Sequence, residues 1–255
     1  MLNKVFQKKR LKSLGAFEEK GKMMQGRDSR VSVIVAALNE ERGIGPTIEE
    51  LQDILTGSHL FVVDGNSVDK TVEIAKNMGA DVSLQEGAGK GDALFQGIRQ
   101  LHPNARYVVF TDADYTYPAE YIPKMLEILE HYPDVGMVIG DRFSGSQNFD
   151  KSSANIFYIG NRFIAAMQHL INGIRLNDPL SGLRVVRAEL LKVWKPKSKG
   201  FDVEVELNSV IGRSGFGIAE IPIEYRRRLG KKKLSPRHGF GILMRILSET
   251  FRMKQ

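Results

Sequence analysis

Short, continuous runs of apolar residues recur through the first half of the chain, and segments with helical periodicity separate them. The run VSVIVAA at 31–37 is typical of a central strand that is buried on both faces. The expected strands lie at 31–37, 60–63, 81–84, 107–110 and 135–139, and the expected helices at 46–55, 67–77, 92–101 and 118–130. This alternation predicts an α/β fold with right-handed crossovers and a mostly parallel central sheet flanked by helices.

The second half has a different pattern, with longer helices and fewer strands. Helices are expected at 155–172 and 201–213, a short strand at 183–187, and an edge strand in the alternating segment 216–225. The last segment, 240–254, predicts an amphipathic helix. Arg245 and Glu249 share its polar face, whereas Leu243 and Ile246 lie on its apolar face.

These patterns divide the chain into three parts. Residues 1–30 form a basic N-terminal extension, 31–240 a single α/β domain, and 241–255 a C-terminal amphipathic helix. No apolar run is long enough to span a bilayer, and the N-terminal segment lacks the apolar core of a secretory signal. The sequence therefore predicts a cytoplasmic protein without a transmembrane helix.

Composition and charge narrow the possible partners. The 255 residues carry a formal net charge of +7 and include no cysteine, which excludes disulfides, thiolate metal sites and cysteine nucleophiles. The charge is +6 in 1–30 and +9 in 226–255, against −8 between them. Basic ends favour a polyanionic partner such as anionic lipid or a phosphorylated substrate, although solubilising tails have the same composition. The acidic middle disfavours nucleic acid, which needs basic surface across the binding face.

Polar residues follow three of the expected strands. Asn39 and Glu40 come after the first strand, and Asp64 ends the second. Asp112 and Asp114 end the strand that begins at residue 107. Because the carboxyl ends of parallel strands meet at one edge of a sheet, we expect these side chains to converge there.

Two carboxylates in Asp112-Ala113-Asp114 stand two residues apart, on one side of a strand end. They repel one another unless a cation joins them, and Mg²⁺ or Mn²⁺ suits two carboxylates plus substrate phosphates. The alternative for this motif alone is a loop with solvated or helix-capping aspartates. Lys90 in the Gly-rich GAGKG segment and Arg142 after the strand at 135–139 are placed to meet a diphosphate.

Several common motifs are missing. No G-x-G-x-x-G follows the first strand, GAGKG lacks the Ser or Thr of a phosphate-binding P-loop, and there is no G-x-S-x-G. The histidines show no H-x-x-x-H spacing for zinc. The sequence thus disfavours a dinucleotide-binding fold, a P-loop enzyme, an α/β-hydrolase and a histidine zinc site.

The remaining segments, in their order along the chain, resemble those of glycosyltransferase family 2. The resemblance covers about 30–240 and is carried by VIVAALNEE, VVDGNSVDKT, EGAGKGDALFQGI, VVFTDADYTYPAEYI, VIGDRF, NDPLSGLRVVR, VEVELNSVIGRSGFGIAEIPIEYRRR and RLGKKKL. More narrowly, the chain is similar to polyprenyl- or dolichyl-phosphate sugar synthases. The resemblance implies the GT-A fold, here with a C-terminal amphipathic helix.

The resemblance also implies a role for each matching residue on the donor side. The base and ribose would be held by Ala36, Leu38, Glu40 and Asp64, with Lys90 near the nucleotide. The phosphates would be contacted by Arg142, Arg227 and Lys233, the last two from a loop that closes over the donor. The chain departs from the family's usual residues at Ala36, Leu38, Gly65 and Lys232.

For the metal and the acceptor, the resemblance implies four catalytic carboxylates. Asp112 and Asp114 would bind Mg²⁺ or Mn²⁺ bridging the diphosphate, with Ala113 beside them. Asp178 in NDPLSG and Glu206 would line the acceptor side. A phosphate acceptor is already anionic and needs no strong general base, whereas a hydroxyl acceptor would need Asp178 or Glu206 in that role.

The implied reaction is inverting transfer of glucose, N-acetylglucosamine or mannose from a nucleotide-diphosphate sugar, with uridine favoured, to a polyprenyl or dolichyl phosphate. Basic amphipathic ends would hold the protein peripherally on the cytoplasmic face of a membrane. One alternative is a soluble family 2 enzyme that acts on a small phosphorylated acceptor or a surface saccharide. Another is a nucleotide-binding module without catalysis. The sequence contains no signal of an oligomeric state.

Overall fold

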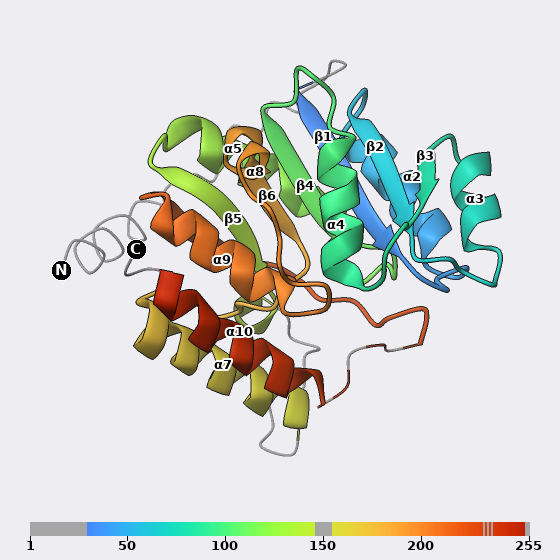
Figure 1. Cartoon of the computed structure of the whole chain (residues 1–255). Coiled ribbons are helices and arrows are strands. Elements are labelled where there is room, and N and C mark those ends of the chain that lie inside the picture. Colours follow the sequence, from blue (N-terminus) through green and yellow to red (C-terminus); the bar gives the residue numbers. More distant parts are fainter. Residues whose placement is uncertain (1–29, 146–154, 232, 234, 236, 253–255) are drawn as a thin grey trace.

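The computed structural model describes residues 30–145, 155–231, 233, 235 and 237–252. The described residues contain a seven-stranded sheet in the order β3-β2-β1-β4-β6-β5-β7 (Figure 1). The strands are β1 (Val31–Ala37), β2 (His59–Asp64), β3 (Asp81–Leu84), β4 (Tyr107–Asp112), β5 (Val135–Asp141), β6 (Arg184–Arg187) and β7 (Gly217–Pro222). Only β6 in this sheet is antiparallel to its neighbours, β4 and β5, so the prediction of a mostly parallel sheet is confirmed.

Helices connect the strands and cover both faces of the sheet. They are α2 (Ile44–Ile54), α3 (Thr71–Asn77), α4 (Lys90–Arg99), the 3₁₀ turn η2 (Ala119–Tyr121), α5 (Ile122–His131), α6 (Arg142–Gly145), α7 (Ile156–Asn172), α8 (Ala188–Lys192), α9 (Val203–Arg213) and α10 (His238–Arg252). The short helices α6 and α8 were not expected from the sequence pattern. The expected helix at 67–77 begins later, because Asp64 accepts hydrogen bonds from the backbone and hydroxyl of Ser67 and holds that segment as a turn.

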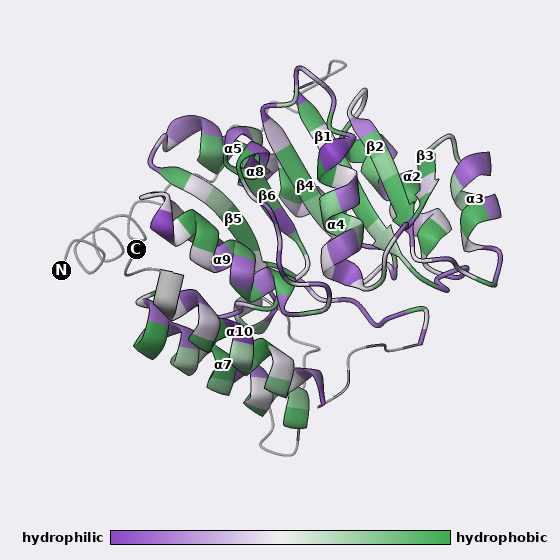
Figure 2. Ribbon diagram, viewed as in Figure 1, coloured by the Kyte–Doolittle hydropathy of each residue, from purple (hydrophilic) through white to green (hydrophobic). Residues whose placement is uncertain are grey.

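Alternate residues of each central strand point to opposite faces of the sheet. Val33 and Val35 pack in one apolar cluster with residues of α2 and α5, whereas Ile34 packs in a second cluster with residues of α4 and α9. Both strand faces are therefore buried, and Figure 2 shows the central strands as almost uniformly hydrophobic. The result is a three-layer arrangement in which helices cover both faces of the central strands.

A third apolar cluster joins α7, α9 and α10. It contains Ile164, Val205, Ile242 and Ile246, and Figure 1 shows these helices lying beside one another below the sheet. The division of the chain at 240/241 stays a prediction, and the extension at 1–30 lies outside the described residues except for Arg30. Each helix in the described ranges is too short or too polar to cross a bilayer.

The antiparallel strand β6 carries a buried arginine that holds the loop before it. Arg184 is 2% exposed. It donates to the carbonyl oxygens of Ser181 (2.8 Å) and Pro179 (2.6 Å) and to Oδ1 of Asn208 (2.5 Å). A charge at this depth is tolerated because every bond it makes satisfies an otherwise buried acceptor.

Replacing this arginine with an apolar side chain of similar length should therefore destabilise the fold. We expect Arg184→Met to lower the free energy of unfolding by about 3 kcal/mol, since Ser181 O and Asn208 Oδ1 lose their donor and Pro179 O keeps only the bond from Asn208 Nδ2. Urea denaturation followed by circular dichroism measures the change. The matched control is Arg99→Met, because the Arg99–Glu86 pair is long (3.4 Å) and exposed, and it should cost less than about 0.5 kcal/mol. Equal effects of the two substitutions would contradict this account of Arg184.

Candidate active site at the carboxyl edge of the sheet

The strand register brings the predicted acidic residues to one edge. Ala37 in β1 is paired with Asp64 in β2, and Ala36 is paired with Asp112 in β4. The carboxyl ends of three adjacent strands are therefore level with one another. Asp112 and Asp64 start from that edge, as the sequence pattern predicts.

The loops that leave these strands contain strained backbone. Asn39, Asn66 and Tyr115 have positive φ angles of 49°, 63° and 65° and follow β1, β2 and β4 respectively. Asparagine adopts this conformation readily, but a tyrosine rarely does. Tyr115 is held there by its backbone N–H, which donates to Thr47 Oγ1 (3.1 Å), and by Arg226 above its ring (4.4 Å). Strain gathered at one edge is typical of a functional site.

The first charged cluster of the site is centred on Lys90. Its Nζ lies 2.6 Å from Asp112 Oδ1 and 2.7 Å from Glu204 Oε1. Burial acts to lower the pKa of Lys90, but the charges of Asp112 and Glu204 outweigh it and raise the pKa. Burial likewise acts to raise the pKa of Asp112, and Lys90 overcomes this and lowers it. Lys90 and Asp112 are therefore both ionised at neutral pH.

Glycines around this cluster allow backbone segments to approach closely. A Cβ at Gly91 would lie 2.1 Å from the carbonyl oxygen of Ser198, and Gly89 has a φ of 86°. A Cβ at Gly182 would lie 2.5 Å from Asp112 Oδ2. Glycine is therefore needed in the GAGKG segment because the backbone at Ser198 lies too close for a side chain. Glycine is needed at position 182, in NDPLSG, because the carboxylate of Asp112 occupies that space.

The second cluster is centred on Arg228, which pairs with Asp114 (2.9 Å) and Glu40 (2.6 Å). Lys233 also pairs with Glu40. Asp114 is almost fully buried and accepts hydrogen bonds from the backbone and hydroxyl of Thr116. Burial first, and the charge of Asp112 second, raise the pKa of Asp114. The charges of the two D-x-D carboxylates therefore affect each other, and Asp112 is paired with Lys90 whereas Asp114 is paired with Arg228.

The donor set at this edge fits a hard divalent cation. Asp112 and Asp114 are two interacting carboxylates, and one oxygen of the neighbouring Glu40 is buried without a hydrogen-bond partner. Mg²⁺ commonly uses one or two carboxylates and completes its shell with water and substrate phosphates. In the described part of the chain no three acidic or histidine side chains form a ready-made cage, so the remaining ligands would come from a substrate.

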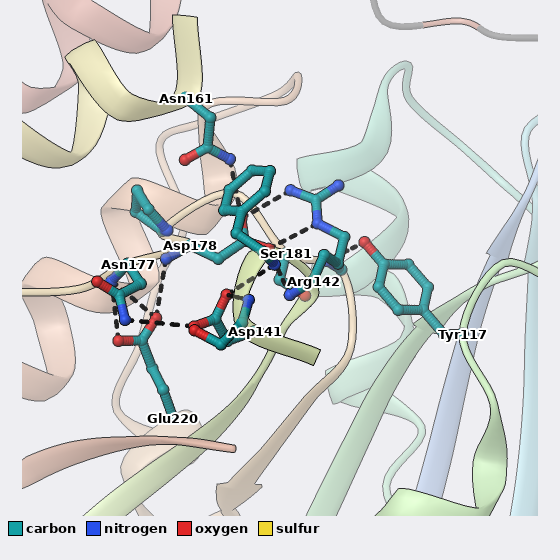
Figure 3. Close-up of polar contacts among 12 residues, drawn as sticks. Tyr117, Asp141, Arg142, Asn161, Asn177, Asp178, Ser181 and Glu220 are labelled. Carbon is teal, nitrogen blue, oxygen red and sulfur yellow. Dashed lines mark hydrogen bonds and ion pairs between the residues drawn. The ribbon is translucent and has the colours of Figure 1, made fainter. Parts of the chain in front are cut away.

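The third cluster holds Arg142 and the loop of NDPLSG (Figure 3). Asp178 is fully buried and receives a bidentate ion pair from Arg142, with N–O distances of 2.6 and 2.7 Å. It also accepts from the backbone N–H of Arg142 and from Asn161 Nδ2 (2.8 Å). The guanidinium of Arg142 stands over the ring of Tyr225 at 5.3 Å. The side chain of Arg142 is thereby fixed in one orientation.

Glu220 of β7 supports the same loop from below. Its carboxylate accepts from the backbone N–H groups of Asn177 and Asp178, each at 2.8 Å. Burial, together with the nearby charge of Asp141, raises the pKa of Glu220 to about 7. Figure 3 shows Glu220, Asp141 and Asn177 grouped on the side of the loop opposite Tyr117.

Other predicted site residues lie apart from these clusters or have other partners. Glu206 is buried, and its carboxylate accepts from the backbone N–H groups of Lys197 and Ser198 and from Trp194. Arg227 is exposed, while its neighbour Arg228 turns toward Asp114. Whether Arg227 contacts a donor stays a prediction.

The residues predicted to hold a base and ribose line the loops after β1 and β2. Leu38 is 40% exposed and Ala36 is half-buried. Asp64 is fully buried, and its carboxylate accepts a hydrogen bond from the backbone N–H of Ser67. Ala113 is buried in the core between the two aspartates. Their contacts to a nucleotide stay a prediction.

Glu204 and Tyr117 were not anticipated from the sequence, and within the basic loop at 226–228 Arg227 was chosen as the phosphate contact in place of Arg228. Glu204 and Glu206 occupy the same helix, and only the structure tells which one faces Lys90. Tyr117 is buried, accepts from the backbone N–H of Gly182 (2.7 Å) and packs edge-on against Tyr225. Tyr117 follows the D-x-D motif closely in VVFTDADYTYPAEYI, and this position could have indicated that it belongs to the site.

Comparisons with known proteins agree with this geometry. Residues 32–194 match the family model "Glycosyl transferase family 2". The chain is 35% identical over 209 residues to a dolichyl-phosphate hexose transferase of Haloferax volcanii, which covers 81% of this chain and 87% of the relative. It is 29% identical to an undecaprenyl-phosphate mannosyltransferase of Micrococcus luteus, over 81% of this chain and 88% of the relative.

A similar solved structure is glucosyl-3-phosphoglycerate synthase from Mycobacterium tuberculosis in complex with Mn²⁺, UDP-glucose and phosphoglyceric acid. Its TM-score is 0.71 at 23% identity, covering 92% of this chain and 86% of that one. The same synthase with Mg²⁺ and UDP gives a TM-score of 0.67. The predicted GT-A fold is confirmed by these likenesses.

The raised pKa of Glu220 predicts how stability depends on pH. The folded-state pKa of about 7 lies above the ordinary value of 4.5, so the folded state binds more protons between these values. Stability should therefore fall as pH rises from about 5 to 8, by on the order of 2 kcal/mol from this group. Glu220→Gln should flatten that fall, measured as the melting temperature at several pH values. The control is Glu86→Gln, an exposed carboxylate, which should leave the pH profile as it is; a steep fall retained in Glu220→Gln would refute the assignment.

Proposed function

The chain belongs to glycosyl transferase family 2, and from this premise we propose that it transfers a hexose from a UDP-linked sugar to a polyprenyl phosphate. The reaction is inverting: the acceptor phosphate attacks the anomeric carbon on the side opposite the leaving diphosphate. Similarity to two enzymes whose names specify polyprenyl-type acceptors supports this acceptor class. The solved synthase with UDP-glucose shares the fold and supports the donor class by analogy.

The main support for the phosphate acceptor is that both candidate general bases, Asp178 and Glu206, already accept several hydrogen bonds within the protein. Asp178 receives four hydrogen bonds, three of them from Arg142. Glu206 is occupied by two backbone N–H groups and Trp194. Neither carboxylate has a free oxygen that faces an incoming hydroxyl. A phosphate needs no deprotonation at neutral pH, so this arrangement favours a phosphate acceptor over a saccharide hydroxyl.

On the donor side, the basic residues of the edge would meet the diphosphate. Arg228, Lys233 and Arg142 are positioned by carboxylates, so their charges are preorganised for a leaving group whose negative charge grows. Lys90 keeps Asp112 ionised. Asp112 and Asp114 would hold Mg²⁺ or Mn²⁺, which would supply positive charge beside the leaving diphosphate.

The nucleoside would lie across the loops after β1 and β2. In this arrangement Ala36, Leu38 and Asp64 line the base and ribose, and Arg227 adds an exposed cation at the opening. The exposed side chain of Leu38 supplies an apolar surface for a base. The protein would associate peripherally with the cytoplasmic face of a membrane, where the lipid phosphate is found.

A second candidate is a family 2 enzyme for a small phosphorylated acceptor. The likeness to a synthase solved with phosphoglyceric acid favours it. Both candidates use a phosphate-bearing acceptor, and they differ in where the labelled product partitions.

A donor and acceptor screen tests the proposal. Radiolabelled UDP-glucose, UDP-N-acetylglucosamine and GDP-mannose are each incubated with polyprenyl phosphate or with phosphoglycerate, in Mn²⁺ or Mg²⁺. We expect a UDP-sugar and polyprenyl phosphate to give label that extracts into organic solvent. Water-soluble product with phosphoglycerate alone would instead support the second candidate. Asp114→Asn should reduce transfer by about 100-fold or more while the circular dichroism spectrum persists.

Two adjacent arginines provide a matched pair for the donor side. Arg228 is tied to Asp114 and Glu40, whereas Arg227 is exposed, although both lie in the basic segment. We expect Arg228→Ala to lower kcat/KM for the donor by about 10- to 100-fold, because a preorganised charge is lost beside the diphosphate. Arg227→Ala should change it by less than about threefold. Equal losses, or a larger loss at Arg227, would contradict the assignment of Arg228.

A further inference from the structure

Helix α7 buries three amide side chains beside its inward apolar contacts, and it exposes a set of large apolar side chains to solvent. Asn161, Gln168 and Asn172 are all buried, and they donate hydrogen bonds to Asp178, to the backbone of α9 and to the backbone of α10. Their spacing of seven and four residues places them on one side of the helix. A helix on the surface of a soluble domain normally exposes its polar side chains and buries its apolar ones.

The outer side of α7 carries a stripe of large apolar residues. Ile156, Ile159, Phe163 and Leu170 are 58%, 48%, 53% and 79% exposed. Their spacing of three, four and seven residues puts them on one line along the helix, about half a turn from the buried amides.

Helix α10, beside α7, likewise exposes large apolar side chains, although Ile242 and Ile246 pack inward. Phe240, Met244 and Leu247 are 72%, 48% and 38% exposed, at a spacing of four and three residues. The inner side holds the buried Glu249, which pairs with Arg213 at 2.6 Å. The two helices lie side by side in Figure 1 and pack through α7 and α10 side chains. We call the seven outward apolar residues of the two helices the α7–α10 face.

This face stands out from the rest of the described surface in both polarity and charge. It contains seven of the twelve large apolar side chains that are exposed in the described ranges. The one acidic residue within 155–175 and 237–250 is Glu249, which is fully buried. Arg162 and Arg237 are exposed on or next to the two helices. Within the described residues of the two helices, the α7–α10 face is therefore apolar with a basic border and without an exposed carboxylate.

We propose that the α7–α10 face docks on an anionic lipid bilayer. Apolar side chains at the helix surface enter the boundary between headgroups and acyl chains, and arginines at the border pair with lipid phosphates. In this proposal the membrane is contacted by two packed helices of the folded domain, in addition to any contribution of the basic chain ends.

A second copy of the chain fits this face less well than lipid does. A two-fold contact would place identical surfaces together, and so would bring the arginines of one face against those of the other. The described residues of the two helices expose no carboxylate that would offset that repulsion. An anionic bilayer offers the opposite charge together with an apolar phase.

The position of the face deepens the proposed function, on which this step rests. Asn161 on the inner side of α7 donates to Asp178, and Asp178 fixes Arg142. The outer side of the same helix forms the docking face. A bilayer seated there would lie within one helix diameter, about 10 Å, of the Arg142 cluster, so a lipid phosphate would need to leave the headgroup layer only slightly.

Vesicle sedimentation with the full chain tests the docking. The vesicles contain phosphatidylcholine with or without phosphatidylglycerol, and no polyprenyl phosphate. We expect the wild type to bind the anionic vesicles. Two double variants, Phe163→Ser with Leu170→Ser and Phe240→Ser with Met244→Ser, should each partition about tenfold or more weakly. The positions are exposed, so the variants should keep the wild-type melting temperature, which is measured in parallel.

A matched control removes apolar surface elsewhere. Val68 and Val193 are 93% and 77% exposed and lie outside the α7–α10 face. Val68→Ser with Val193→Ser should bind vesicles like the wild type. The inference is overturned if the control loses as much binding as the face variants. It is also overturned if the face variants bind as the wild type does at about 0.5 M salt, where attraction by the basic ends is screened.

Sedimentation velocity separates lipid docking from self-association. If the wild type is a dimer, the face variants are monomers and vesicle binding is unchanged, the face is a subunit interface and the inference fails. Transfer to a short, water-soluble prenyl phosphate without vesicles should be the same in all variants. If no phosphate acceptor is glycosylated while vesicle binding behaves as expected, the proposed function fails and the docking face stands.

Discussion

Charge neutralisation between buried side chains at the carboxyl edge of the sheet determines how the site is built. Lys90 lies between Asp112 and Glu204, Arg228 between Asp114 and Glu40, and Arg142 against Asp178. Breaking such a pair leaves a buried charge without a partner, which costs several kcal/mol. The loops that carry these residues are therefore held in place by one another. The positive φ angles after β1, β2 and β4 lie in the same loops and are held by separate hydrogen bonds, such as that from Tyr115 N–H to Thr47 Oγ1.

The same pairing bears on how a charged donor would be accommodated under the proposed function. Arg228 and Lys233 already balance Glu40 and Asp114, so a diphosphate alone would add uncompensated negative charge to this edge. A nucleotide diphosphate that arrives with a divalent cation brings both signs at once, so the edge would remain neutral throughout. The D-x-D motif and the basic segment thus act under the proposed function as one electrostatic unit.

Much of the fold follows from the sequence because sheet geometry is repetitive. The run at 31–37 is β1 to the residue, and the parallel register then aligns Asp64 with Ala37 and Asp112 with Ala36. Sheet geometry could not predict which of two nearby charged residues faces the site. Glu204 and Glu206 lie on nearly opposite sides of α9, because two residues correspond to more than half a turn. In the loop at 226–228 no periodicity exists, so the direction of Arg228 depends on tertiary contacts alone.

The orientation of helices α7 and α10 could not be predicted from their amphipathic patterns. Helix α10 buries residues of both its predicted faces: Ile246 of the apolar face and Glu249 of the polar face are fully buried, and Arg245 pairs with Asp202. Phe240 and Met244 face outward. Periodicity reports that a helix has two faces but not which of them the protein covers. Here the covered side is set by the polar network behind it, since Asp178 and the charges of α9 and α10 require polar partners. Ile164, Ile242 and Ile246 share the covered side with this network, whereas Phe163, Leu170, Phe240 and Met244 are left outside, and under the proposed docking a bilayer would cover them.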